Sequence, residues 1–293
     1  MIGDVVGDPG MEVLEERLPL LKKENSADFV IVNGENAAGG FGLTETLLER
    51  ILAAGADVVT SGNHIWEKRD FWPVLEREKR VLRPLNYPEI TNCTDDQAHG
   101  QKAVVQRTAG HGWVKIEKLS GQETIEWFVV NLQGREFMNP IDCPFKAFDA
   151  IEERIKNRDF SGPVHCDETP GAEPESKPVI LVDFHAESTR EKEALAYYLD
   201  GRVSAIAGTH THVQTADERI LPNSSAYITD LGMTGMPDGI IGMDVKVCLD
   251  RARNQVLYRM EAAASGGKPA IQGVILEFDG ETKKAVSIKR IPR

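Results

Sequence analysis

The sequence predicts an α/β protein in which strands and helices alternate along a chain of 293 residues. Two observations support this fold class. Short apolar runs of strand length recur and are followed by segments with helical spacing, as in proteins with parallel sheets. Several of these runs also end in polar side chains, at the strand ends where open α/β sheets place their functional sites. We expect one domain over residues 1–293 with a small excursion.

The first expected strand ends at Asp4, in the opening segment MIGDVVGDPG, before Gly-rich turns. Only three residues precede Asp4, whereas a typical strand has about five. The first strand is therefore expected to be unusually short, unless the start is truncated relative to the natural chain.

Two strand and helix units follow. DFVIVNG (28–34) is a continuous apolar run that ends in polar residues, as expected of a buried parallel strand. TETLLERILAAGA (44–56) has helical spacing, with Thr44 as the expected N-cap and Gly55 as the C-cap. DVVTSGNH (57–64) repeats the strand pattern and leads into EKRDFWPVLEREKR.

The rest of the chain contains a second series of alternating elements. Clustered β-formers predict antiparallel strands from about 100 to 132, and the Pro-rich, Gly-rich and acidic segment 158–178 predicts an exposed loop for which we find no function. The later expected elements are a strand at 178–187, a helix at 188–200, a strand at 203–212, the segment SAYITD, a helix at 245–257, and strands near 271–278 and 284–291.

Composition argues against several classes of function. The net charge of -12 would repel a long polyanion, so no stable binding of duplex nucleic acid is expected. There is no basic, apolar leader, and the longest apolar runs are far too short to span a bilayer, which predicts a cytoplasmic protein without a membrane partner. The four cysteines form no CxxC pair, which argues against a thiolate zinc site.

Side chains that can bind a metal gather at the expected strand ends. Taken singly, each has a commoner structural role, such as an Asp in a turn or a buried structural His. Imidazole, carboxylate and amide oxygen together suit iron, manganese, zinc or cobalt, and His210 and His212 face the same way on an extended segment. Their repetition at five strand ends favours a metal centre. The candidates are Asp4, Glu35, Asn36, Asn63, His64, His185, His210 and His212.

The Gly-rich segment NGENAAGGFGLT, between a strand and a helix, has a second interpretation as a dinucleotide phosphate loop. Its spacing does not give GxGxxG, and it opens with Glu and Asn rather than Gly, which argues against that interpretation. Asn36, Phe41 and Gly42 are instead expected to line the mouth of a substrate site.

The motifs together resemble a known family. GDVVG, NGENAAGGFGLT, SGNHIW, NPIDCPF, VDFHAE, GTHTHVQTADERILP and TDLGMTGMPDGIIGM occur in this order and are similar to the YmdB-like branch of the calcineurin-type metallophosphoesterases. These are bacterial phosphodiesterases associated with 2′,3′-cyclic nucleotides. The resemblance runs over nearly the whole chain, and NGENAAGG with GTHTHVQTAD is its most specific part.

The resemblance implies a four-layer α/β/β/α sandwich with a small cap within about 66–131, and a site for two divalent ions of iron, manganese or zinc. It implies that Glu35 bridges the ions, where the wider superfamily usually has Asp, and that His64 helps the leaving group to depart. The ligands implied for one ion are Asp4 and His212, assisted by Asn36, and those for the other are Asn63, His185 and His210.

We therefore expect a metal-dependent phosphodiesterase that hydrolyses P–O ester bonds in small phosphodiesters or cyclic nucleotides. Two alternatives stay open. One is a phosphomonoesterase or 5′-nucleotidase on the same scaffold, and the other is a non-catalytic regulatory protein that binds metal. The sequence also leaves a homo-oligomer open.

Overall fold

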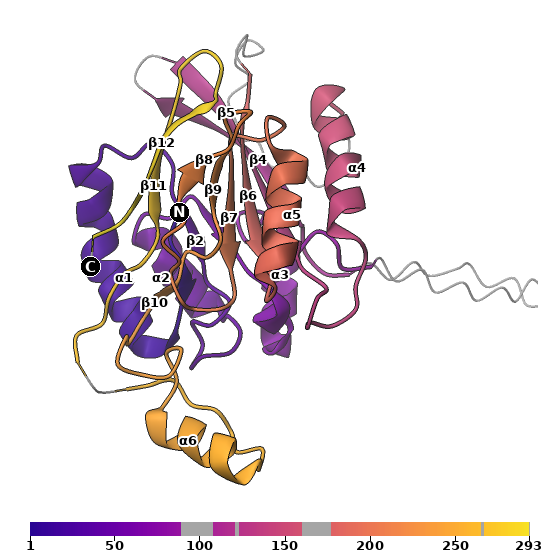
Figure 1. The fold of residues 1–293 in the computed structure, drawn as a ribbon. Helices are drawn as coiled ribbons and strands as arrows, with labels where there is room; N and C mark the ends of the chain where they lie inside the picture. Colours follow the sequence, from indigo (N-terminus) through magenta and orange to yellow (C-terminus); the bar gives the residue numbers. More distant parts are fainter. Residues whose placement is uncertain (89–107, 121–122, 160–176, 265–266, 293) are drawn as a thin grey trace, which may run out of the picture.

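A computed structural model describes residues 1–88, 108–120, 123–159, 177–264 and 267–292 (Figure 1). It has a mixed α/β fold with a central sheet of six strands. The expected strand segment at 103–107 and most of the acidic loop at 158–178 lie outside the described residues. Among the residues described, the helices are too short or too polar to cross a membrane.

The central sheet has the strand order β4-β5-β6-β7-β9-β8. Its four inner strands run parallel, whereas the edge strands β4 and β8 are antiparallel to their neighbours. Strand β6 is buried along its whole length, and burial of a parallel strand on both faces accounts for its continuous apolar run. The strands are β4 (Trp113–Ser120), β5 (Glu123–Gln133), β6 (Val179–His185), β7 (Ala205–Thr209), β8 (Arg219–Ile220) and β9 (Ala226–Ile228).

Six further strands form pairs beside this sheet. Ile2, just before β1, forms bridges to Val32 in β2 and to Gly273 beside the start of β11, and β1 itself pairs with β10. The first strand is short, as the sequence predicts. The parallel pairs are β1 (Asp4–Val5) with β10 (Met233–Thr234) and β2 (Ile31–Asn33) with β3 (Val58–Thr60), and the antiparallel pair is β11 (Val274–Phe278) with β12 (Ala285–Arg290).

Helix α1 (Gly7–Glu24) begins where the sequence predicts Gly-rich turns, so that interpretation is wrong. The reason is local. Gly7 adopts a positive φ of 62° at the end of the strand, and Pro9 follows in the first helical turn, where its missing N–H removes no hydrogen bond.

The other helices agree better with their patterns. Thr44 is the N-cap of α2 as predicted, and its side chain accepts a hydrogen bond from the Leu47 N–H. The C-cap is Ala54, with Gly55 one residue later at a φ of 112°. The helices are α2 (Glu45–Ala53), α3 (Trp72–Arg77), α4 (Pro144–Lys156), α5 (Thr189–Leu199) and α6 (Val245–Asn254), with 3-10 helices at Asn63–Trp66 and Arg69–Phe71.

Apolar side chains form three large clusters. One packs α1 and α2 against β1 to β3, a second packs α4 and α5 against the central sheet, and a third lies between β2, β3 and the central sheet. Figure 1 shows α1 and the pair α4 and α5 on opposite sides of the molecule, with α6 set apart from the sheets. Strand β4 belongs to the central sheet, and residues 89–107 of the expected cap lie outside the described residues. The cap stays a prediction.

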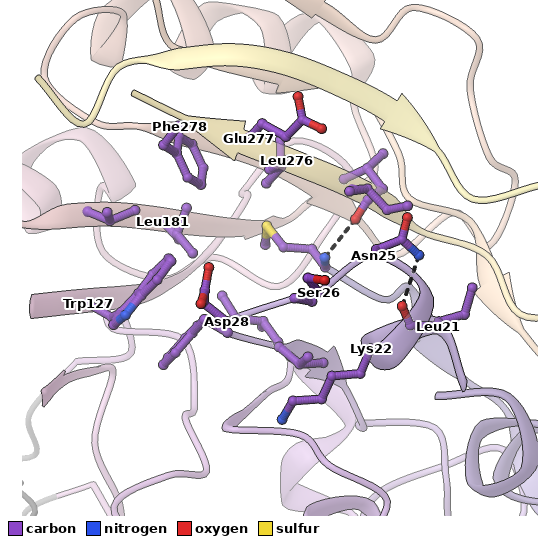
Figure 2. Close-up of a pocket in the computed structure, with 18 of the residues that line it drawn as sticks. Leu21, Lys22, Asn25, Ser26, Asp28, Trp127, Leu181, Leu276, Glu277 and Phe278 are labelled. Carbon is purple, nitrogen blue, oxygen red and sulfur yellow. Dashed lines mark hydrogen bonds between the residues drawn. The ribbon is translucent and has the colours of Figure 1, made fainter. Parts of the chain in front are cut away.

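One cavity lies near the amino ends of β2 and β6 and has a volume of about 360 Å³ (Figure 2). Trp127, Leu181, Leu276 and Phe278 are among the residues that line it. Its lining contains none of the predicted metal or substrate residues. The polar site described below lies instead at the carboxyl ends of the strands.

Candidate metal centre

The predicted ligands come together because β1, β2 and β3 end at the same place as β6 and β7 of the central sheet. Asp4 lies in β1, and Glu35 and Asn63 follow β2 and β3 by two and three residues. His185 is the last residue of β6, and His210 is the first residue after β7. The side chains of Glu35, His185 and His210 offer ligand atoms that all lie within 4.8 Å of one another.

His185 lies at the centre of one half of this cluster. Its Nε2 atom is 2.9 Å from Glu35 Oε1, 3.2 Å from Asn63 Oδ1 and 3.0 Å from His210 Nδ1. Glu35 and His185 are almost completely buried, at 1% and 0% exposure. Four potential ligands thus point at one small volume.

In the other half of the cluster, an amide oxygen and an imidazole nitrogen face each other. Asn36 donates its amide N–H to the Gly40 carbonyl at 2.8 Å, so its Oδ1 faces His212 Nε2 at 3.3 Å. His212 Nδ1 lies 2.8 Å from the Ile241 carbonyl, to which it must donate. When the His212 ring is neutral, its Nε2 lone pair faces the lone pair of Asn36 Oδ1, and a cation between these two acceptor atoms would remove their repulsion.

Asp4 adds a buried carboxylate with an unsatisfied atom. Its side chain is fully buried, and its Oδ1 has no hydrogen-bond partner among the described residues. The Oδ2 atom accepts only a long hydrogen bond of 3.3 Å from the His210 N–H. The nearest cationic group to Oδ1 in the described part of the chain is His185, whose Nδ1 lies 3.9 Å away. A buried carboxylate oxygen without a hydrogen bond is costly, and a metal ligand position would account for it.

Each histidine of the cluster has its second ring nitrogen fixed by another group. His185 Nδ1 lies 3.0 Å from Thr209 Oγ1, which itself donates to Asp183 at 2.7 Å. His210 Nε2 lies 3.2 Å from Glu187 Oε2. With His212 held by a carbonyl, all three rings are oriented as they are in protein metal sites, where outer partners fix the tautomer of the ligand.

Burial and mutual contacts shift the pKa values of the side chains in the metal-free cluster. Burial raises the pKa of Asp4 to about 7 and outweighs the attraction of His212 and His185. Burial also acts to raise the pKa of Glu35, but the His185 charge and hydrogen bond lower it to about 2. Burial and the neighbouring His185 lower the pKa of His210 to about 3. The buried carboxylates and neutral imidazole fit the donor set of a divalent transition metal.

His64 lies beside the cluster rather than in it. Its backbone N–H donates to Glu35 Oε2 at 3.0 Å, and its ring packs edge-on against Phe41 at a centroid distance of 4.9 Å. The His64 side chain is 25% exposed and lines a cavity of about 510 Å³ together with Asn36 and Phe41. Gly42 does not line this cavity; it lies in a turn with a φ of 82°, where a Cβ would come within 2.9 Å of Lys68.

The two histidines after β7 adopt unusual backbone conformations. His210 and His212 have φ values of 101° and 65°, in a region that favours glycine. Between them, Thr211 donates from its N–H and its hydroxyl to Asp230 Oδ2, at 3.1 and 2.8 Å. The same oxygen accepts from the Lys192 ammonium at 2.7 Å, and both charged side chains are 1% exposed. This buried ion pair holds the strained loop in place.

Several contributors to the site could not be identified from the sequence. Thr209, Asp183 and Glu187 act on the histidines from neighbouring strand positions, and Asp230 does so from a distant segment. The sequence offers one signal, which is spacing. Asp183 lies two residues before His185 and shares a face of β6 with it, and Glu187 follows His185 by two residues. Helix α6 also lines the cavity, although its sequence gives no sign of this.

Comparisons with known proteins cover nearly the whole chain. A family model described as YmdB-like protein matches residues 1–291. The chain is 43% identical over 291 residues to a 2′,3′-cyclic-nucleotide 2′-phosphodiesterase of Bacillus subtilis (strain 168), covering 99% of this chain and 94% of that protein. A hypothetical protein from Thermus thermophilus has a similar crystal structure, with 37% identity, a TM-score of 0.77 and coverage of 99% of this chain and 96% of the other. A phosphatase from Mycoplasma pneumoniae has 33% identity, a TM-score of 0.78 and coverage of 99% and 90%.

Proposed function

Because the chain belongs to the YmdB-like protein family, we propose that it is a metal-dependent phosphodiesterase that hydrolyses P–O ester bonds in small nucleotides, with 2′,3′-cyclic nucleotides as the first candidates. The name of the Bacillus subtilis relative supports this substrate class. The observation that carries the proposal is the convergence of Glu35, His185 and His210 within 4.8 Å, beside a buried Asp4 oxygen that lacks a hydrogen-bond partner among the described residues.

The residues present suit two divalent ions of iron, manganese or zinc. Asp4 and His212, assisted by Asn36, would hold one ion, and Glu35 would bridge to the second. When bound, the ions would supply Lewis-acid activation of a phosphoryl oxygen and of the attacking water. The remaining ligands, which would hold the second ion, are Asn63, His185 and His210.

His64 would act on the leaving group. The water oxygen forms a new bond to phosphorus and keeps one of its protons, while its other proton passes to solvent. The P–O bond to the leaving oxygen breaks, and the His64 ring donates a proton to that oxygen and regains one from solvent. The Glu35 contact to the His64 backbone and the Phe41 ring orient this side chain toward the cavity.

The proposal extends to the architecture. The helices α1 and α2, the short strands, the central sheet and the helices α4 and α5 would form the four layers of an α/β/β/α sandwich. The three apolar clusters between these layers support this arrangement. A small cap within 66–131 remains part of the proposal.

The experiment uses protein stripped of metal and reloaded separately with Mn²⁺, Fe²⁺ or Zn²⁺. We expect about two ions per chain by elemental analysis and turnover of 2′,3′-cyclic AMP and of bis(p-nitrophenyl) phosphate. Glu35→Gln should lose turnover and part of the metal, whereas His111→Asn, a change outside the cavity lining, should not. Hydrolysis of none of these substrates by metal-loaded protein would refute the proposal and favour a non-catalytic role.

A phosphomonoesterase is the second candidate, because the related Mycoplasma pneumoniae structure is described as a phosphatase. The same preparations should be assayed with p-nitrophenyl phosphate. Faster turnover of the monoester than of bis(p-nitrophenyl) phosphate would favour this second activity.

A further inference from the structure

The metal-site cavity has a second wall that the metal centre does not explain. One wall carries Glu35, His64 and the two histidines after β7, and the other consists of helix α6 and the residues that follow it. Helix α6 has no buried residue, and Figure 1 shows it set apart from the sheets. The helix therefore contributes little to the core while bordering the site.

Arg251 on α6 is the only Lys or Arg among the described residues that line this cavity. The one hydrogen bond that its side chain makes to the described residues is long, at 3.5 Å from Nη1 to the Tyr258 carbonyl. No ion pair to a carboxylate is found for it in the described part of the chain, whereas Arg50, Arg202 and Arg219 each pair with at least one carboxylate. In a protein with a net charge of -12, an arginine in a site without an acidic partner points to a ligand.

The cavity is larger than a phosphate group needs. Its volume of about 510 Å³ lies in the range of sites for whole small molecules, roughly 300–1,000 Å³. A phosphate held at the metal centre would leave the rest of a nucleotide to extend toward α6. The planar guanidinium can stack on a base and hydrogen-bond to its acceptor atoms.

We infer that Arg251 is a specificity-determining residue that binds the nucleobase of a nucleotide whose phosphate lies at the metal centre. This inference rests on the proposed function. It predicts that Arg251 distinguishes nucleotide substrates from phosphodiesters without a base.

The test compares Arg251→Met and Arg251→Lys with Arg253→Met, a matched change on the same helix at an exposed position outside the cavity lining. For 2′,3′-cyclic nucleotides, we expect Arg251→Met to raise KM on the order of tenfold with kcat within about twofold, which corresponds to about 1.4 kcal/mol. Arg251→Lys keeps the charge but loses the planar group and should be impaired as well. Turnover of glycerol 1,2-cyclic phosphate, a cyclic phosphodiester without an aromatic ring, should change little, and Arg253→Met should behave as the wild type.

A binding measurement tests the inference without turnover. Isothermal titration of metal-loaded protein with adenosine 3′-monophosphate should show a weaker Kd in Arg251→Met and an unchanged Kd in Arg253→Met. An unchanged KM and Kd in Arg251→Met, or an equal loss for glycerol 1,2-cyclic phosphate, would overturn the role of Arg251. A wild-type protein that hydrolyses no phosphodiester would instead refute the proposed function.

Discussion

His64 and Glu35 share one hydrogen bond, yet their environments assign them different tasks. Glu35 is buried among ligand atoms, whereas the His64 ring borders the cavity. We expect His64→Ala to keep its metal and to lose about 10² to 10⁴ in rate, the range for a general acid. The loss of rate should be smaller for substrates whose leaving group is p-nitrophenolate, because this weak base needs little protonation to depart. Rates for substrates with good and poor leaving groups, together with metal content, measure both effects.

Loss of metal in His64→Ala, or equal slowing for good and poor leaving groups, would rule out an acid role for His64. Its contact with Glu35 uses the backbone N–H, which the substitution keeps. The variant should therefore leave the Glu35 carboxylate in place.

The contact between His185 and Glu35 makes metal uptake depend on pH. Burial alone would lower the pKa of His185, but the Glu35 carboxylate raises it to about 9 in the metal-free protein. A metal must displace the proton that His185 carries at neutral pH, so we expect Mn²⁺ affinity to fall as the pH drops from about 9 to about 6. Calorimetry in buffers of different ionisation enthalpy should detect proton release. An affinity that stays constant over this range would show that His185 is not a ligand.

For single residues, the sequence predicts which side chains lie at the strand ends better than it predicts the contacts that those side chains make. Polar residues at strand ends identify Asp4, Glu35 and His185, because parallel strands bring their ends together. The register between β6 and β7 brings Thr209 beside His185, and no local pattern specifies this register. The turn at Gly42 needs glycine because the backbone there has a positive φ and no room for a Cβ. The surrounding sequence does not show whether a glycine serves such a turn or contacts a substrate.

Among the elements, the loop after β7 depends on a side chain from the segment after β9. Asp230 joins Lys192 of α5 to Thr211 between the two histidines. We expect Asp230→Asn to weaken metal binding at least about tenfold and to reduce stability, because breaking a buried ion pair costs about 3–5 kcal/mol. Thr211→Val removes one hydroxyl, whose hydrogen bond contributes about 1 kcal/mol to stability. This variant should weaken metal binding with little loss of stability.

Calorimetric metal affinity and thermal unfolding of the metal-free variants separate these effects. If Thr211→Val bound metal as tightly as the wild type, and folded Asp230→Asn did the same, the ion pair would support the fold alone. Asp230 would then have no positioning role for the histidines.

Helix α1 illustrates why some elements escape prediction. Its opening residues GDPG are typical of turns, and the positive φ of Gly7 agrees with that interpretation at one position. The following Pro9 is equally at home in the first turn of a helix. Packing of Leu14 and Leu18 against the short strands then stabilises a helix whose start the sequence does not specify.

For the molecule as a whole, the site connects the two groups of strands. Asp4, Glu35 and Asn63 come from β1 to β3, and His185 and His210 come from β6 and β7 of the central sheet. An ion bound between them links segments far apart in the chain. Because the unfolded chain cannot provide this arrangement, binding should stabilise the fold by about 2.7 kcal/mol at a metal concentration about 100 times Kd.

Without metal, Asp4 should destabilise the molecule. Because burial raises the pKa of Asp4 to about 7, the folded protein holds its proton more tightly than the unfolded chain does. The Asp4 contribution is therefore absent below about pH 4 and reduces stability progressively as the pH rises to about 7. A pKa difference of this size corresponds to about 4 kcal/mol as an upper bound.

Asp4→Asn should therefore improve the stability of the metal-free protein while weakening its response to metal. The amide keeps the size of the side chain but carries no charge to bury. We expect the variant in the presence of a chelator to unfold at a higher temperature than the wild type at about pH 8, and at nearly the same temperature at about pH 4. Added Mn²⁺ should raise the unfolding temperature of the wild type much more than that of the variant. If chelated wild type and variant lost stability equally over this pH range, Asp4 would not be the buried charge that the bound ion compensates.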